Sequence, residues 1–163
     1  MRLHTANGER QAQLALLDRV WLGNLPLDGV AVATCDLCAT GDNVGLLGLN
    51  VTGAYNLQLN TDAAEAVFSA RSERNRRLDV APFSDMEARF ARYPGGRVEV
   101  EVDFENLASR PISKAAALVQ CGSAMWTVTH EQVQPGERVQ AQRRLPAHEA
   151  CESYQVSLFS AAW

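Results

Sequence analysis

Four cysteines are the residues of this chain whose type and spacing predict chemistry most directly. Cys35 and Cys38 are separated by two residues, whereas Cys121 and Cys151 lie far apart in the second half. Four cysteines allow three pairings, and the sequence favours Cys35 with Cys38 and Cys121 with Cys151. Because disulfides persist in oxidising compartments, we expect a periplasmic or extracellular protein. A reduced protein in the cytoplasm is the alternative, since no basic and then apolar leader follows Met1.

The same cysteines have two other interpretations. Cys35-x-x-Cys38 and His148-x-x-Cys151 together would supply three thiolates and one imidazole, a set suited to tetrahedral zinc. A redox-active dithiol at Cys35 and Cys38 would need the motif at the start of a helix, whereas a strand is expected before it and a polar loop after it. Structural disulfides are the favoured interpretation, and we expect no metal and no cofactor.

Carboxylate pairs are the next group that could carry chemistry. Two aspartates in Asp-Thr-Gly or Asp-Ser-Gly loops can share a proton and activate a water molecule, but neither triplet occurs in the chain. Asp28 is the one aspartate that directly precedes a glycine, and its Pro26-Leu27-Asp28-Gly29 context predicts a turn. Nothing resembles the nucleophile elbow of a Ser-His-Asp hydrolase. We therefore expect no catalytic residue in these 163 residues.

The first half is expected to consist of strands and hairpins. Asn7-Gly8, between two extended segments, predicts an N-terminal hairpin, because both central residues of a type I′ turn need positive φ. A turn-rich stretch over residues 23–29 precedes an expected buried strand at 30–33. Residues 55–59 alternate and should pair with 65–68, although a helix over 62–74 is the alternative.

The second half predicts a helix and then a small sandwich. Ser84 and Glu87 have the spacing of a capping box, which predicts a short linker helix that ends before Tyr93-Pro94-Gly95-Gly96. Residues 97–104 alternate between apolar and charged side chains, as in a strand with one buried face. Further strands are expected at residues 115–121, 125–130, 138–143 and 154–159. The chain is thus predicted to be mainly β, with parts at residues 1–78, a linker at 79–96 and a β-sandwich at 97–163.

The order of motifs over residues 3–69 resembles the latter part of bacterial retropepsin-like aspartic peptidases. The resemblance depends on the tetrapeptide Thr5-Ala6-Asn7-Gly8, on Gly23-Asn24 and on Leu46-Leu47-Gly48. It implies half of a retropepsin-like β-barrel. It also implies that Thr5, Ala6, Asn7 and Gly8 form the flap that closes over an extended peptide, and that Leu46, Leu47 and Gly48 pack beneath the catalytic loop.

This chain departs from the family at the catalytic triplet, which in the family precedes the flap. The departure predicts either that the catalytic segment lies upstream of Met1 or that catalysis has been lost. In the first case the partners would be a peptide or protein substrate and a second copy in a homodimer. In the second case the chain would be a non-catalytic, exported binding or structural protein. Residues 98–106, with Pro111-Ile112 and Gln134-Pro135-Gly136-Glu137, loosely resemble immunoglobulin-like accessory domains of exported bacterial proteins.

Composition and charge exclude several classes of protein. With 47% hydrophobic and 21% charged residues, the chain has the composition of a folded globular protein rather than a disordered one. Its formal net charge of −4 argues against nucleic-acid binding, which needs a basic surface. Its apolar stretches are only a few residues long, so we expect no membrane insertion.

Overall fold

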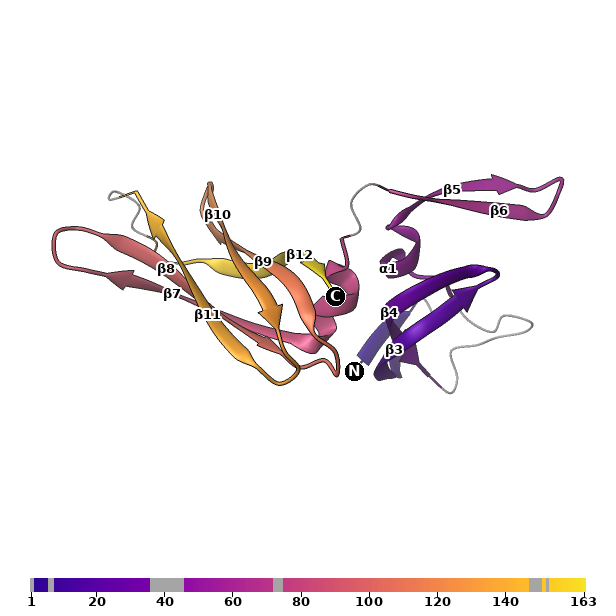
Figure 1. The fold of residues 1–163 in the computed structure, drawn as a ribbon, viewed down its shortest axis with the longest axis horizontal. Coiled ribbons are helices and arrows are strands. Elements are labelled where there is room, and N and C mark those ends of the chain that lie inside the picture. The colour runs from indigo at the N-terminus through magenta and orange to yellow at the C-terminus, as the bar shows by residue number, and fades with distance from the viewer. Residues whose placement is uncertain (1, 6–7, 36–45, 72–74, 147–150, 152) are drawn as a thin grey trace. The chain divides into compact units, whose positions relative to one another are not determined.

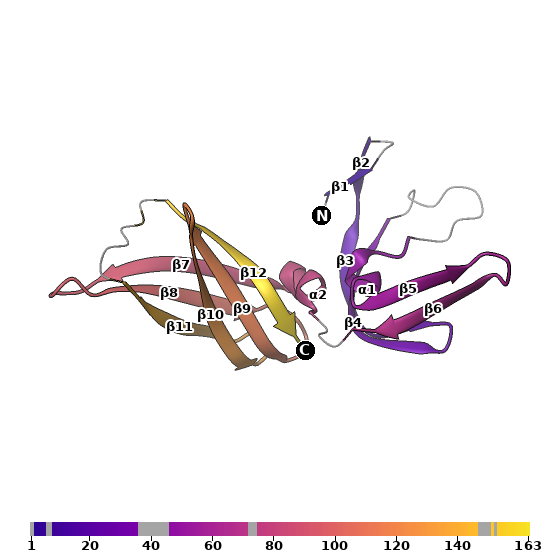
Figure 2. The same ribbon diagram turned by 90° about the horizontal axis from the view of Figure 1, so that it is seen from above.

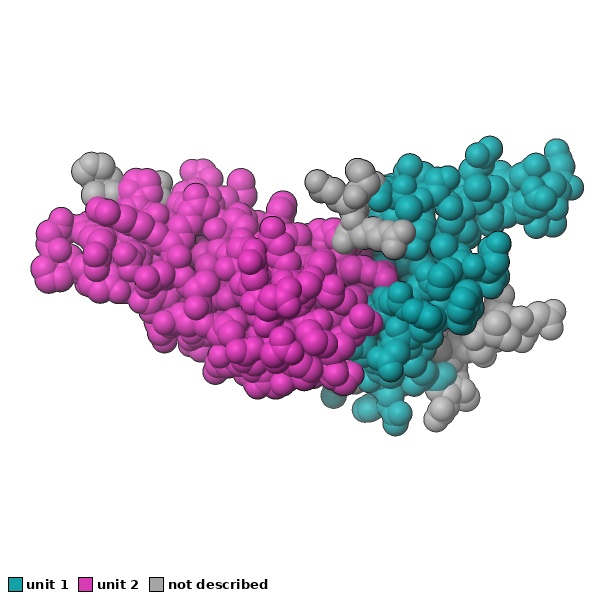
Figure 3. Space-filling model, in the orientation of Figure 1, with its two compact units in different colours: residues 1–74 teal, residues 75–163 magenta. Residues whose placement is uncertain are grey.

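The computed structural model describes residues 2–5, 8–35, 46–71, 75–146, 151 and 153–163. The described chain is mainly β, as predicted, and is built from small antiparallel sheets. It divides into two compact units, residues 1–74 and residues 75–163, which are coloured teal and magenta in Figure 3. We call these unit 1 and unit 2.

The described part of unit 1 contains three antiparallel strand pairs and one short helix (Figure 1). In chain order they are β1 (Arg2–Thr5), β2 (Gly8–Gln11), β3 (Gln13–Leu22), β4 (Leu25–Thr34), α1 (Leu49–Thr52), β5 (Tyr55–Asn60) and β6 (Glu65–Ala70). The pairing of β5 with β6 confirms the predicted hairpin and rules out the alternative helix. The N-terminal hairpin is also present, as β1 and β2.

Unit 1 has a small core between β4, α1 and β5. Its buried residues are Leu27, Val30, Val51, Ala54 and Tyr55. The Tyr55 ring meets Phe68 of β6 edge to face, with ring centroids 5.9 Å apart. This core is too small to cover every apolar side chain of the unit, and several large ones remain exposed.

The turn expected over residues 23–29 is much shorter in the structure. Leu22 pairs directly with Leu25, so the chain reverses at Gly23-Asn24 and β4 begins at Leu25. Asp28 therefore lies inside a strand, opposite Arg19, and its prediction as a turn residue was wrong. Burial explains the difference, because Leu27 is 1% exposed and draws this segment into the sheet.

Unit 2 begins with a helical turn and continues as six strands in its described part. The elements are α2 (Arg77–Val80), the 3-10 helix η1 (Ala81–Phe83), β7 (Ser84–Arg92), β8 (Val98–Asn106), β9 (Ile112–Cys121), β10 (Ala124–Val133), β11 (Arg138–Leu145) and β12 (Gln155–Ala162). They form two sheets with strand orders β11-β8-β7 and β10-β9-β12. Figures 1 and 2 show these sheets face to face, as in a β-sandwich.

Alternating side chains from both sheets fill the sandwich. β8 is buried at every second residue from Val98 to Asn106, which confirms the pattern read from the sequence. Val100 and Val102 of β8 pack in one cluster with Val119 of β9 and Trp126 of β10. A second cluster contains Phe104, Ile112 and Val133, among others. Apolar residues at every second position therefore account for the core between the two sheets of unit 2.

The predicted linker helix over residues 84–93 was wrong. This segment is β7, which pairs along its whole length with β8, so the expected linker at 79–96 contains a strand of the unit 2 sheet. Met86, Ala88 and Phe90 alternate toward the core, and this pattern outweighs the capping-box spacing of Ser84 and Glu87. The helical residues of this region come earlier, in α2 and η1.

Candidate functional site

The predicted flap corresponds to the β1–β2 hairpin. Thr5 pairs with Gly8, and the register continues to Arg2 opposite Gln11. Gly8 is therefore the first residue of β2 rather than a central turn residue, and its φ of 100° still favours glycine. Ala6 and Asn7 lie outside the described residues. All four residues of β2 are exposed, so the hairpin presents a polar strand to solvent.

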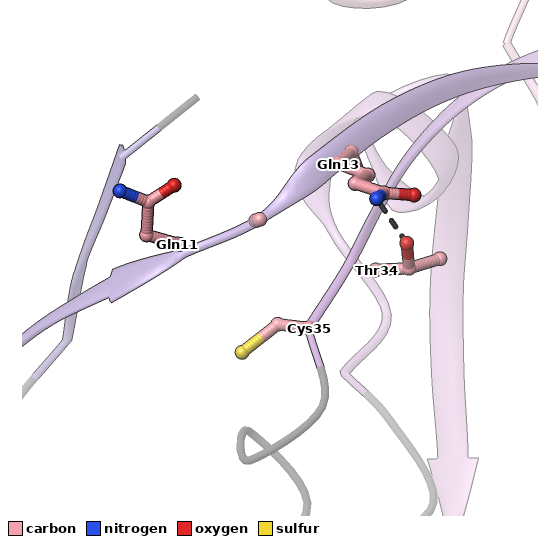
Figure 4. A pocket seen from close by; sticks show the side chains of 5 residues that line it. Gln11, Gln13, Thr34 and Cys35 are labelled. Carbon is pink, nitrogen blue, oxygen red and sulfur yellow. Dashed lines mark hydrogen bonds between the residues drawn. The ribbon is translucent and has the colours of Figure 1, made fainter.

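A shallow pocket of about 220 Å³ lies at the base of this hairpin (Figure 4). Gln11 and Ala12 line it from the end of β2, and Gln13, Thr34 and Cys35 line it where β3 and β4 pair. The Thr34 hydroxyl donates a hydrogen bond of 3.5 Å to the Gln13 carbonyl. The lining is thus polar, with amide and hydroxyl groups beside the flap strand.

Leu46, Leu47 and Gly48 lead into α1. Leu46 is 100% exposed and Leu47 is 49% exposed, so the expected packing beneath a catalytic loop is not made within the described chain. The carbonyl of Gly48 accepts the first helical hydrogen bonds, from the N–H groups of Val51 and Thr52 at 3.1 Å.

Gly48 occupies a position that a larger residue would disturb. A Cβ atom there would lie 2.6 Å from Oδ1 of Asn50. The Asn50 side-chain N–H donates to the Ala31 carbonyl at 2.9 Å, which fixes α1 to β4. Since β4 pairs with β3, which follows the hairpin, the two predicted motifs are connected through one small scaffold.

The described aspartates do not form a catalytic dyad. Four of them bind arginine instead, at 2.6 to 3.5 Å, in the pairs Arg19–Asp28, Arg76–Asp79, Arg138–Asp85 and Arg89–Asp103. The hydrogen bond and the charge of Asp28 raise the pKa of Arg19 above its ordinary value. Asp36 and Asp42 lie outside the described residues. These carboxylates therefore serve as ion-pair partners rather than as a water-activating pair.

The disulfide predicted in unit 2 is confirmed. Cys121 and Cys151 are bonded, with Cα atoms 5.9 Å apart and a sequence separation of 30. Because Cys151 is engaged, it is unavailable as a thiolate ligand, and the zinc alternative was wrong. The described ranges also contain no group of three metal-ligating side chains. Cys35 is disulfide-bonded too, whereas Cys38 and His148 lie outside the described residues.

Some candidate residues were missed at the sequence level. Gln11, Gln13 and Thr34 line the pocket, but glutamine and threonine on expected strands carry no signal of a site. These three residues lie close together only because of the register of β3 with β4 and the position at which β2 ends. A second open pocket, of about 610 Å³, lies between the β3–β4 turn and β6, with Leu22, Leu25 and Phe68 among its lining residues. Neither pocket could be derived from residue types alone.

Comparisons of the chain with protein-family models, with curated proteins and with solved structures found no match. Within the part of the chain that the structure describes, no helix is long and apolar enough to cross a membrane. The retropepsin-like and immunoglobulin-like resemblances therefore rest on the sequence motifs alone.

Proposed function

We propose that unit 1 is the flap-bearing part of a retropepsin-like aspartic peptidase. In this proposal the Asp-Thr-Gly or Asp-Ser-Gly loop belongs to a segment upstream of Met1. The 163 residues contain no such triplet, so in this proposal they do not hydrolyse peptides by themselves. The function of the complete protein would be hydrolysis of peptide bonds.

The exposure of Leu46 and Leu47 carries this proposal. Two adjacent leucines that are 100% and 49% exposed leave an apolar surface that favours a covering segment. Further large apolar side chains of unit 1 are uncovered as well, including Trp21 at 62% and Leu59 at 66%. A catalytic segment that packs on Leu46-Leu47-Gly48 would supply this cover and would lie near the scaffold that holds the flap.

The mechanism follows from the hairpin and from paired carboxylates. An extended peptide would lie against the β1–β2 hairpin and add to it as a strand through main-chain hydrogen bonds. Two aspartates, one from each subunit of a symmetric dimer, would share a proton and activate water for attack on the scissile carbonyl. The polar pocket beside Gln11 would receive part of the bound peptide.

Unit 2 has a different role in this proposal. Its two packed sheets and its Cys121–Cys151 disulfide are typical of immunoglobulin-like modules of exported proteins. Such a module would bind or space rather than catalyse. With disulfide-bonded cysteines in both units, a periplasmic or extracellular location is part of the proposal.

The second candidate is an exported binding or structural protein without catalysis. The observation that favours it is that the given sequence contains neither an Asp-Thr-Gly nor an Asp-Ser-Gly triplet. The coding sequence before Met1 separates the two candidates. An in-frame Asp-Thr-Gly or Asp-Ser-Gly preceded by a leader supports the peptidase, and an in-frame stop codon supports the binding protein.

A further inference from the structure

One buried polar side-chain atom among the described residues has no hydrogen-bond partner, and it is Nε2 of His130. His130 lies on β10, opposite Ala115 of β9, and is only 3% exposed. Its imidazole stacks on the Phe104 ring of β8, with centroids 5.4 Å apart and planes 25° apart. Phe104 and Ala115 both belong to the second core cluster, so the imidazole faces an apolar interior.

A protonated imidazole would be poorly accommodated at this position. The neutral ring fits as a flat, mostly apolar group against Phe104, whereas an imidazolium would need a partner for its new charge. Asp103 on β8 is the charged group whose negative charge favours protonation of the ring. Its carboxylate is already engaged by Arg89 at 3.5 Å and by the Gln140 amide at 3.1 Å.

The other charged side chains near His130 belong to the outer surface. Lys114 on β9 and Glu131 on β10 are exposed and pair with each other in register. Glu105 on β8 binds Arg138 of β11 at 3.7 Å. Each of them alternates in sequence with a buried residue and so points away from the core.

We propose that His130 makes unit 2 an acid-sensitive module, in which protonation of the buried imidazole loosens the sandwich at mildly acidic pH. This inference goes beyond the proposed function and does not depend on it. Its consequence is a change in the packing of unit 2 between neutral and acidic surroundings, brought about by one side chain.

The sign of the effect follows from linkage. Burial lowers the pKa of His130 below the ordinary value of 6.5, and the charge of Asp103 opposes this only in part. Between the two pKa values, His130 is therefore protonated in the unfolded chain but neutral in the folded chain. The unfolding equilibrium constant should therefore increase about tenfold per pH unit below about pH 6.5, until the pKa of the folded state is reached. Above about pH 6.5 the group has no effect.

The test is urea unfolding of the full chain with and without His130→Phe, from about pH 8 to about pH 5. Trp126 is 6% exposed in the unit 2 core, and Trp21→Phe removes the tryptophan of unit 1, so fluorescence then reports on unit 2. The ratio of the unfolding constants, native histidine over phenylalanine, should rise about tenfold per pH unit below about pH 6.5. Carboxylates titrate in both proteins and cancel in this ratio.

His4→Phe is the matched control, and it should leave the pH dependence as it is in the native sequence. A ratio that stays constant with pH would overturn the proposal. Should His130→Phe fail to fold, the titration of the His130 Cε1–H signal by NMR decides instead. A midpoint below that of an unperturbed histidine supports the acid-sensitive module, and a midpoint at or above it refutes it.

Discussion

The Cys121–Cys151 disulfide should contribute a large part of the stability of unit 2. It joins the end of β9 to the segment before β12, and the loop that it closes contains β10 and β11. Replacing both cysteines by alanine removes the cross-link with little loss of packing, because Cys121 lies at the margin of the first core cluster. The perturbation therefore acts mainly on the unfolded chain.

The magnitude can be worked out from the length of this loop. With a sequence separation of 30 between the two cysteines, the chain-entropy relation gives about 3–4 kcal/mol. For a domain of this size, about 1 kcal/mol corresponds to a change in Tm of roughly 4–8 °C. The double alanine variant should thus unfold on the order of 20 °C below the native protein.

Thermal unfolding followed by Trp126 fluorescence, in the Trp21→Phe background, measures this difference. The matched control replaces Cys35 and Cys38 by alanine, which should leave the unit 2 transition unchanged because Cys35 belongs to unit 1. If the Cys121/Cys151 variant melts within about 5 °C of the native protein, the cross-link is not a main source of stability. The reasoning from loop closure would then be refuted.

Three further substitutions have definite expected outcomes. Asn106→Ala should destabilise unit 2 by about 2–4 kcal/mol in urea unfolding, because the fully buried amide donates to Val133 and to Arg110 at 3.0 and 2.9 Å. Gly48→Ala should weaken unit 1 by about 1 kcal/mol in its own unfolding transition, because the new Cβ displaces Asn50 from its carbonyl acceptor. If the proposed peptidase is correct, Gly8→Val should abolish peptide cleavage by the N-terminally extended protein, because its φ of 100° excludes a β-branched residue.

Controls separate these effects from general damage. Gln140→Ala removes an exposed amide of unit 2 and should change stability by less than about 0.5 kcal/mol. Asn50→Ala should cost at least as much as Gly48→Ala, because it removes the hydrogen bond to the Ala31 carbonyl outright. The two losses should not add in the double variant, because both act on that bond. In the Gly8→Val protein the unit 2 melting transition should be unchanged. Full cleavage activity in that protein would count against the flap.

The strands of unit 2 were predictable where apolar and polar residues alternate along the sequence. Val98, Val100, Val102 and Phe104 alternate with charged residues, and this alternation alone places one face in the core. At residues 84–93 two local patterns conflict, and the sequence reading chose the wrong one. Ser84 and Glu87 have the spacing of a helix start, whereas the alternation of Met86, Ala88 and Phe90 fits a strand that pairs with β8.

The candidate site was predictable only where a motif determines local geometry. The Asn7-Gly8 dipeptide predicted a hairpin, but the register that makes Gly8 the first residue of β2 depends on how the two strands pair. The exposure of Leu46 could not be anticipated, because apolar residues are ordinarily predicted to be buried. The pocket at Gln11 and Thr34 depends on contacts between segments that are distant in sequence.

Peptide hydrolysis by the protein extended to include its upstream coding sequence tests the central proposal most directly. The assay follows cleavage of an unfolded protein substrate at mildly acidic pH by mass spectrometry, because one carboxyl of the dyad must be protonated. We predict cleavage by the extended protein, and none by the 163-residue chain or after the triplet aspartate is replaced by asparagine. A folded extended protein without cleavage, or an upstream sequence without the triplet, would contradict the peptidase and favour the binding protein.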